Sequence, residues 1–247
     1  MSGVSLLPIT NLPEIRPGDD LTALLCQAQP SLEPGDILVV TQKVVSKSEN
    51  RLVKLTSVTP SPRALEIARK WDKDPQLVEL VLQESHRLLR EERGVLISLT
   101  RQGFVCANAG IDLSNVDGGQ TACLLPLDCD ASARRLSEEI GAHLGFPVPV
   151  IISDSFGRPW RMGITNIALG SFGLEALLDH RGTPDSCGLE MKATVIAVAD
   201  SVAASTELVV GKTTGFGATL VRGYSYTPSG ESNIQATLRP WEHCFFT

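Results

Sequence analysis

Short apolar runs recur along the chain, and each is bounded by polar or turn-forming residues. Such runs, rich in Val, Ile and Leu, are typical of strands that are buried on both faces. We therefore predict strands at residues 36–41, 95–100, 148–153, 194–199 and 218–222.

Helix start signals stand between these runs. Ser61-Pro62 and Asp74-Pro75 each place a capping side chain before a proline at the first helical position. The second of these helices is predicted to continue to about Arg90, because apolar residues keep helical spacing up to that point. This apolar stripe consists of Leu77, Leu80, Val81, Leu88 and Leu89.

Two further helices are predicted, one from just after Asp130 to about His143 and one over residues 201–210. Strands and helices do not alternate regularly, so the fold class is α+β, with mixed sheets and flanking helices. No Pro/Gly/Ser-rich linker divides the chain. Residues 1–247 should therefore form a single unit or two closely joined subdomains, with an irregular tail after Gly223 packed across the body.

The composition is that of a globular protein, with 247 residues of which 43% are hydrophobic and 20% charged. A formal charge of −6 offers no basic face for a phosphate backbone, which argues against a nucleic-acid partner. No stretch has the length or apolarity of a membrane span or a signal peptide. The six cysteines are scattered, without metal-ligand spacing, so we expect reduced thiols and a cytoplasmic protein.

Two aspartates are candidate ligands for a cation, because each follows an apolar run and stands in a loop of small residues. Asp112 stands in the segment CANAGIDLSNV, and Asp154 closes VPVIISD and is followed by Ser155. Carboxylates at strand ends can hold a hard divalent cation, since Mg²⁺ takes one or two carboxylates and completes its shell from water and phosphate. The alternative is that each aspartate caps a helix or forms a turn.

Basic residues follow the second aspartate. The loop FGRPWRMG carries Arg158 and Arg161, which could receive phosphate or carboxylate oxygens in pairs, or could belong to a salt-bridged surface loop. Lys47 follows the first predicted strand and could project into the same cleft. A lysine in a surface turn is the alternative.

The segment GKTTGFG, residues 211–217, resembles the end of a phosphate-binding P-loop, but the match fails. The motif requires a glycine where Thr206 stands, and here a helix leads into the loop and a strand leaves it. A glycine-rich turn with one lysine can still cradle phosphates in another geometry, or Gly211 can simply end a helix. The four histidines show no paired spacing and no GxSxG motif occurs, so covalent nucleophilic catalysis is not indicated.

Six motifs in order together resemble the coenzyme F420-0:γ-glutamyl ligase family, over essentially the whole chain from about residue 8. They are LPEIRPGDDL, GDILVVTQKVVSKSENR, GFVCANAGIDLSNV, LPLDCDASARRL, SDSFGRPWRMG and GKTTGFGATLVRG. The resemblance implies an α+β fold that is neither P-loop nor ATP-grasp, and intertwined homodimers. It also implies an enzyme that uses GTP and Mg²⁺ or Mn²⁺, with K⁺ as an additional ion, to join L-glutamate to F420-0.

By the same resemblance, Asp112, Asp154 and Ser155 should bind the metal, and Lys47 and Arg158 should join the two aspartates in catalysis. The expected nucleotide contacts are Thr10, Asn11, Leu12, Pro13, Gln42, Lys47, Asn115, Gly211, Lys212, Thr213, Thr214, Gly215, Phe216, Gly217 and Ala218.

Three positions depart from the family pattern. Ser201 replaces an acidic residue, Leu189 replaces an arginine, and the loop around Phe216 lacks an acidic residue and a Val-Pro pair. Two alternatives therefore stay open: a related ligase acting on another carboxylic acid, and a non-catalytic GTP-binding regulatory relative.

Overall fold

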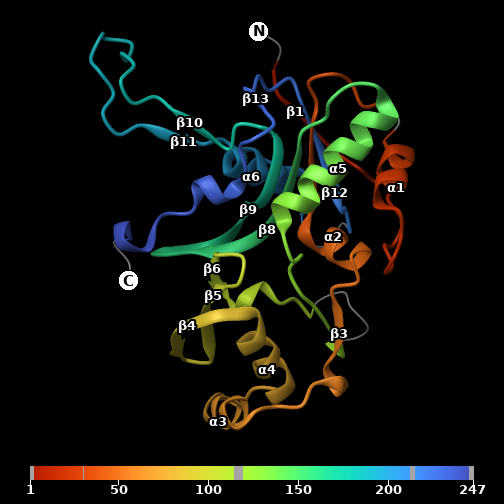
Figure 1. Ribbon diagram of the computed structural model, residues 1–247, viewed down its shortest axis with the longest axis vertical. Helices are drawn as coiled ribbons and strands as arrows, with labels where there is room; N and C mark the ends of the chain where they lie inside the picture. The colour runs from red at the N-terminus through yellow and green to blue at the C-terminus, as the bar shows by residue number, and fades with distance from the viewer. Residues whose placement is uncertain (1–2, 30, 114–118, 212–214, 245–247) are drawn as a thin grey trace.

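The centre of the molecule is a six-stranded sheet, seen in a computed structural model that describes residues 3–29, 31–113, 119–211 and 215–244 (Figure 1). β2 and β8 are parallel, whereas the other neighbouring strands pair antiparallel. In spatial order the strands are β1 (Ser5–Pro8), β12 (Ala218–Arg222), β2 (Ile37–Thr41), β8 (Val150–Arg158), β9 (Arg161–Leu174) and β13 (Pro228–Ser229).

Helices cover both faces of this sheet, because successive side chains of a strand point to opposite sides. Val39 and Ile151 pack with helix α6 (Val198–Val210) on one face. Val40 and Ile152 pack with α5 (Cys129–Leu144) and α1 (Leu21–Ala28) on the other. The result is a three-layer core in which the central strands are buried on both sides.

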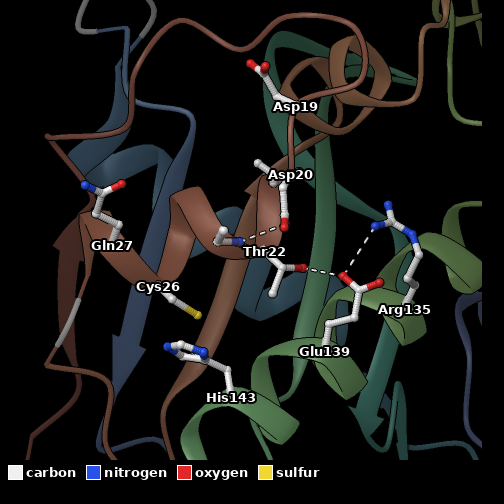
Figure 2. A pocket seen from close by; sticks show the side chains of 10 residues that line it. Asp19, Asp20, Thr22, Cys26, Gln27, Arg135, Glu139 and His143 are labelled. Atoms are coloured by element: carbon white, nitrogen blue, oxygen red, sulfur yellow. Dashed lines mark hydrogen bonds and ion pairs between the residues drawn. The ribbon is translucent and has the colours of Figure 1, made fainter.

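A pocket of about 590 Å³ lies between α1 and α5 (Figure 2). Several of its polar side chains have partners: Asp20 caps α1 by accepting the Ala23 N–H, and Glu139 accepts from the Thr22 hydroxyl and pairs with Arg135. The remaining lining residues are Asp19, Leu21, Cys26, Gln27 and His143.

A second group of elements lies below the central sheet in Figure 1. A three-stranded antiparallel sheet packs there with α3 (Pro62–Trp71) and α4 (Pro75–Glu84) around a separate apolar cluster. Its strands are β4 (Ser85–Glu92), β5 (Val95–Thr100) and β6 (Val105–Ala107). Chain segments β3 (Leu52–Lys54), η1 (Leu55–Ser57) and β7 (Thr121–Cys123) connect this group to the central sheet.

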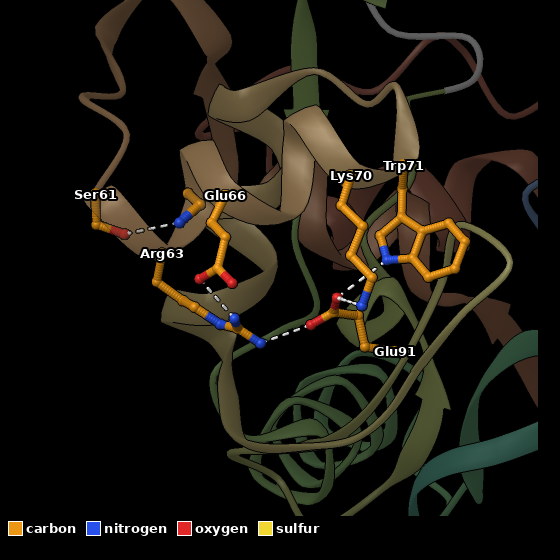
Figure 3. Close-up of polar contacts among 7 residues, drawn as sticks. Ser61, Arg63, Glu66, Lys70, Trp71 and Glu91 are labelled. Atoms are coloured by element: carbon orange, nitrogen blue, oxygen red, sulfur yellow. Dashed lines mark hydrogen bonds and ion pairs between the residues drawn. The ribbon is translucent and has the colours of Figure 1, made fainter.

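Glu91 fixes α3 to β4 (Figure 3). Its carboxylate receives Lys70 and the Trp71 indole N–H at 2.9 and 3.0 Å, and Arg63 at 2.6 Å. The hydrogen bond from Lys70 is the largest of the effects that hold the pKa of Glu91 below its usual range. The helix start is fixed by Ser61, whose side chain accepts the Ala64 N–H.

A narrow two-stranded arm extends from the upper left of the body in Figure 1. It consists of β10 (Leu177–Asp179) and β11 (Val195–Ala197), with the chain between them forming the tip. The chain after Arg222 contains, besides β13, two short 3₁₀ helices, η4 (Ile234–Thr237) and η5 (Trp241–His243). The irregular tail predicted from the sequence is thus confirmed for residues 223–244.

The α+β class is confirmed, and the strands predicted at 36–41, 95–100 and 218–222 agree with β2, β5 and β12. The helices after Ser61-Pro62 and Asp130 agree with α3 and α5. All six cysteines lie in the described residues as free thiols. Within the described ranges, no helix has the length and apolarity needed to cross a bilayer.

The helix predicted to reach Arg90 ends at Glu84, which makes that boundary wrong. Ser85 adopts an extended conformation, and the chain continues as β4, paired with β5 through a two-residue turn. Arg93 and Gly94 form this turn and both have positive φ, as the tight hairpin turn requires. Strand pairing therefore outweighed the helical spacing of Leu88 and Leu89.

Two other boundaries were wrong. The predicted strand 148–153 begins at Val150 and continues to Arg158, because β9 pairs with it along its whole length. Asp154 consequently lies within β8 and does not end the strand. The run 194–199 is a strand only over Val195–Ala197, since α6 begins at Val198 instead of Ser201.

Candidate functional site

The parallel pairing of β2 and β8 creates the edge on which the candidate site is built. Thr41, the last residue of β2, lies directly opposite Ser153 of β8. Gln42, the next residue after Thr41, begins α2, whereas Asp154, the next residue after Ser153, stays in β8 and lies just beyond the end of β2. Ligand sites of open parallel sheets lie at this carboxyl edge.

Helix α2 (Gln42–Ser48) begins immediately at this edge. Lys43 and Lys47 are one helical turn apart and so lie on the same side of it. Lys43 Nζ is 2.7 Å from Asp112 Oδ2. Lys47 pairs with Glu14 and is only 8% exposed, so the surface-turn alternative for this lysine is wrong.

Asp112 is held by its backbone. Its N–H donates to the Cys123 carbonyl at 3.0 Å, and the Cys123 N–H donates to the Asp112 carbonyl at 2.8 Å. The turn that leads to it, η2 (Asn108–Gly110), places Ala109 at a positive φ. This pair of backbone hydrogen bonds fixes Asp112 against the last residue of β7.

The second aspartate, Asp154, lies on β8 of the central sheet. β8 contacts β6, the strand that leads into the Asp112 segment, and also contacts α2. The Ser155 N–H donates to Asp154 Oδ1 at 2.8 Å, and the Ser155 hydroxyl donates to Asn166 Oδ1 on β9 at 2.8 Å.

The pKa values of two buried thiols, Cys106 and Cys123, are affected by the charged groups of this region. Burial, reinforced by the Asp154 carboxylate, raises the pKa of the Cys106 thiol to about 12. Burial likewise raises the pKa of Cys123 to about 11, with Lys43 lowering it and Asp112 raising it. Both shifts favour the protonated thiol at neutral pH.

The donor set suits a hard cation. Asp112, Asp154 and Ser155 offer only oxygen atoms, as Mg²⁺ and Mn²⁺ prefer. Among the described residues, no group of three or more His, Cys, Asp and Glu side chains could hold a metal by itself. Two carboxylates that leave further positions to phosphate and water fit Mg²⁺ chemistry better than a closed protein cage does.

Three of the predicted nucleotide-binding segments are in contact with one another. The Thr41 N–H donates to the Gly217 carbonyl at 2.9 Å, and the Ile9 N–H donates to the Ala218 carbonyl at 2.9 Å. A Cβ atom on Gly217 would lie 2.5 Å from Val44 and 3.1 Å from Leu12, so only glycine allows this approach. The loop before β12, the segment 10–13 and α2 are thus in contact.

Gln42 has an unmet hydrogen-bonding need. It is 2% exposed, and its Oε1 has no hydrogen-bond partner within the described part of the chain. Buried carbonyl oxygens normally receive a donor, so a ligand with an N–H or O–H group would complete it. Asn11 and Pro13 line a small pocket of about 360 Å³ next to α1.

Other predicted residues are less closely gathered. Gly211 ends α6, and Gly215 and Phe216 precede the Gly217 contact. Arg158 lies exposed at the tip of the β8–β9 hairpin and donates to the Met162 carbonyl at 3.2 Å. Asn115, Lys212, Thr213 and Thr214 lie outside the described residues.

Sequence reasoning missed Lys43, Glu14 and Asn166. Lys43 stands one turn before Lys47, so recognising a helix at 42–48 would have predicted both on one side. The pocket between α1 and α5 contains none of the predicted site residues. Its carboxylates satisfy helix caps and ion pairs instead.

The structure is that of an α+β protein in which Lys43 of α2 contacts Asp112 beside the end of β2, with Asp154 on the neighbouring parallel strand β8. The family model for F420-0:γ-glutamyl ligase matches residues 10–223, and the chain belongs to that family.

Several curated relatives are similar to this chain over most of its length. The coenzyme F420:L-glutamate ligase of Methanothermobacter thermautotrophicus is 40% identical over 246 residues, covering 97% of each chain. That of Methanopyrus kandleri is 41% identical over 86% of this chain and 84% of its own. The Archaeoglobus fulgidus enzyme of the same name is 40% identical over 97% of this chain and 94% of its own.

Proposed function

We propose that this protein is a ligase of coenzyme F420 biosynthesis that adds L-glutamate to F420-0 through γ-linked amide bonds. GTP is the proposed co-substrate, and Mg²⁺ or Mn²⁺ the metal, with K⁺ as an additional ion. The observation that carries the proposal is the role of α2. This one helix presents Lys43 to Asp112 and also contacts the glycine-tight junction of Leu12 and Gly217.

Amide formation from a carboxylate is uphill, so the carboxylate oxygen must first become part of a good leaving group. In the proposed sequence, the γ-phosphoryl group of GTP passes to a carboxylate oxygen of F420-0, and GDP leaves. The amine of glutamate then attacks the acyl carbon, the bond from that carbon to the phosphate oxygen breaks, and the amine loses a proton.

The chain's own residues have defined tasks in this scheme. Asp112, Asp154 and Ser155 would hold the divalent ion, which when bound supplies charge neutralisation to the phosphates. Lys47 is buried beside the site and provides fixed positive charge, and Arg158 is proposed to add more from the hairpin. The Gly217 junction orients the nucleotide against α2.

The first experiment measures GDP and phosphate release from GTP with Mg²⁺ or Mn²⁺, L-glutamate and F420-0, each component being omitted in turn, with mass analysis of the product. We expect a product heavier by one or more glutamyl units that requires every component. GTP binding without product would favour a non-catalytic regulatory relative. Glutamylation of a different acid in competition assays would favour the related ligase.

Charge-removing variants test the site. Asp112→Asn and Asp154→Asn should lose most turnover while remaining folded, because the amide lacks the charge that holds the cation. Asp72→Asn is the matched control, since Asp72 ends α3 in a left-handed conformation that asparagine adopts readily. Near-normal turnover in either site variant would remove that aspartate from the proposed metal site.

Two further elements of the proposal concern the protein in the cell. We propose a cytoplasmic protein, because none of the six cysteines is paired in a disulfide. We also propose a homodimer, because the β10–β11 arm exposes apolar side chains that a partner copy would cover. These are Leu178, Leu189, Val195 and Ile196.

A further inference from the structure

Asn166 connects the proposed metal site to the interior of the protein. It lies on β9 directly opposite Ser155 of β8 and is 6% exposed. The Ser155 hydroxyl donates to its Oδ1 at 2.8 Å, and its Nδ2 donates to Thr206 Oγ1 at 3.3 Å. Thr206 lies on α6 and donates its own hydroxyl hydrogen to the Ala203 carbonyl at 2.7 Å.

The direction of this hydrogen-bonded chain is determined from its inner end. The single hydrogen of the Thr206 hydroxyl is directed to a carbonyl, so Thr206 can only accept from Asn166. The amide must therefore turn its NH₂ group toward Thr206 and its oxygen toward Ser155. An amide oxygen only accepts, so Ser155 must be the donor.

This polarity has a chemical consequence at Ser155. A hydroxyl oxygen binds a cation through its lone pairs, and it does so best when its hydrogen points away. Because the hydrogen of Ser155 is directed at Asn166, its lone pairs are directed away from Asn166. The carboxylate that would share a cation with it belongs to the adjacent residue, Asp154.

We propose that Asn166 is a positioning residue for the metal site, oriented in turn by Thr206. It fixes the Ser155 hydroxyl as a hydrogen donor toward the protein interior, so that the oxygen is presented to the divalent cation. This inference rests on the proposed function, which assigns Ser155 to the metal.

A purely structural role is the competing explanation. Asn166 and Thr206 are both nearly fully buried, and Thr206 belongs to the buried face of α6 together with Val202 and Ala203. In such a place an apolar pair of similar shape would stabilise the protein about as well, since a net hydrogen bond contributes only about 1 kcal/mol. A polar chain that ends at Ser155 is better explained by the orientation it imposes there.

The test titrates Mn²⁺ alone into the purified full chain and follows free Mn²⁺ by electron paramagnetic resonance. Loss of a group that orients a metal ligand typically weakens binding by about 10- to 100-fold. We expect Asn166→Ala to weaken Mn²⁺ binding about 10-fold, at the low end of that range. Thr206→Val should also weaken Mn²⁺ binding. Thr206→Ser keeps the hydroxyl and should bind Mn²⁺ with wild-type affinity.

The matched control is Ser171→Ala, which removes a buried hydroxyl from the same strand, β9. Ser171 Oγ has no partner within the described residues, so its removal should leave Mn²⁺ affinity unchanged. Melting temperatures of all variants report stability separately. If Asn166→Ala does not fold, the pair Thr206→Val and Thr206→Ser still decides the question.

A double variant separates positioning from general weakening. With Ser155→Ala already present, Asn166→Ala should cause no further loss of affinity, because there is no hydroxyl left to orient. A further loss of about 10-fold in that background would overturn the positioning role. If Ser155→Ala itself binds Mn²⁺ normally, the assignment of Ser155 in the proposed function fails. If only Ser155→Ala weakens binding and Asn166→Ala does not, the proposed function stands and this inference fails.

Discussion

The half-buried carboxylate of Asp130 hydrogen-bonds to two segments that are distant in the sequence. Its Oδ1 accepts the N–H groups of Ser171 on β9 and Ile234 in η4, at 2.9 and 3.0 Å. Burial nevertheless raises the pKa of Asp130 above its usual value, so the fold disfavours the ionised carboxylate relative to the unfolded chain. The Ser171 and Ile234 N–H groups need an oxygen acceptor, whereas the negative charge of the carboxylate lowers the stability of the folded protein.

The pH dependence follows from the direction of this shift. A carboxyl with a raised pKa in the folded state contributes stability below its unfolded pKa and loses it as pH rises through the folded value. Asp130→Asn keeps the accepting oxygen and removes the charge. At pH 7 we expect it to raise the free energy of unfolding by on the order of 1 kcal/mol, and the gain to vanish near pH 4.

Thermal denaturation between pH 4 and pH 8 measures this difference as a melting-temperature shift of about 2–4 °C at neutral pH. Asp130→Leu is the contrasting variant. It leaves the Ser171 and Ile234 N–H groups without an acceptor, and should destabilise by about 1–3 kcal/mol for each group left buried. A less stable Asp130→Asn at pH 7 would show that the charge itself holds the tail.

Individual site residues were predictable to different degrees. Asp112 was predicted to lie in a loop of small residues, and it follows the tight turn η2. Asp154 was assigned to a strand end, whereas it lies within β8. The error arose because β9 pairs with residues 154–158, and pairing between strands is not visible in the hydropathy of one strand.

At the scale of elements, Gly217 controls the junction of three segments. Its carbonyl accepts from Thr41 at the end of β2, and its missing side chain allows Val44 and Leu12 to approach. Val44 is β-branched and therefore stiff, so it cannot easily move aside. A methyl group here would push α2 and the segment 10–13 away from the loop.

We therefore expect Gly217→Ala to destabilise the protein by about 1–3 kcal/mol, the usual cost of overpacking. It should also weaken GTP binding, measured by calorimetry, because the proposed nucleotide segments separate. Val44→Ala in the same chain should restore both quantities by reopening the space. Gly230→Ala serves as the control, since a Cβ there meets nothing within 4 Å. If Gly217→Ala binds GTP with wild-type affinity, this junction is not part of the nucleotide site.

The elements most reliably predicted were those with strong local signals. Proline after a capping residue located the starts of α3 and α4, and unbroken Val/Ile/Leu runs located β2 and β5. The end of α4 was not predictable from the apolar spacing, because Leu88 and Leu89 suit either a helix or a strand. The turn at Arg93-Gly94 was the signal that would have separated the two.

At the scale of the whole molecule, the β10–β11 arm is incompletely supported by its own chain. A two-stranded ribbon is at best marginally stable in water unless another surface covers it. The base of this arm contacts α6, whereas its far end extends from the body in Figure 1. Exposed apolar groups continue along it, from Leu178 and Ile196, which are cross-strand partners, to Leu189 at the tip.

A second copy of the chain would supply the missing cover, and this is the basis of the proposed homodimer. Light scattering coupled to size-exclusion chromatography should give twice the 26.5 kDa chain mass at micromolar concentration. Leu189→Lys combined with Ile196→Lys should shift the protein to the single-chain mass, since each buried apolar anchor that is lost weakens association about tenfold. Leu127→Lys, which changes an equally exposed leucine outside the arm, should leave the mass unchanged.

A wild-type protein of single-chain mass would refute the dimer. A dimer that survives both arm substitutions would place the interface on another surface, and the ribbon would then need a different source of stability.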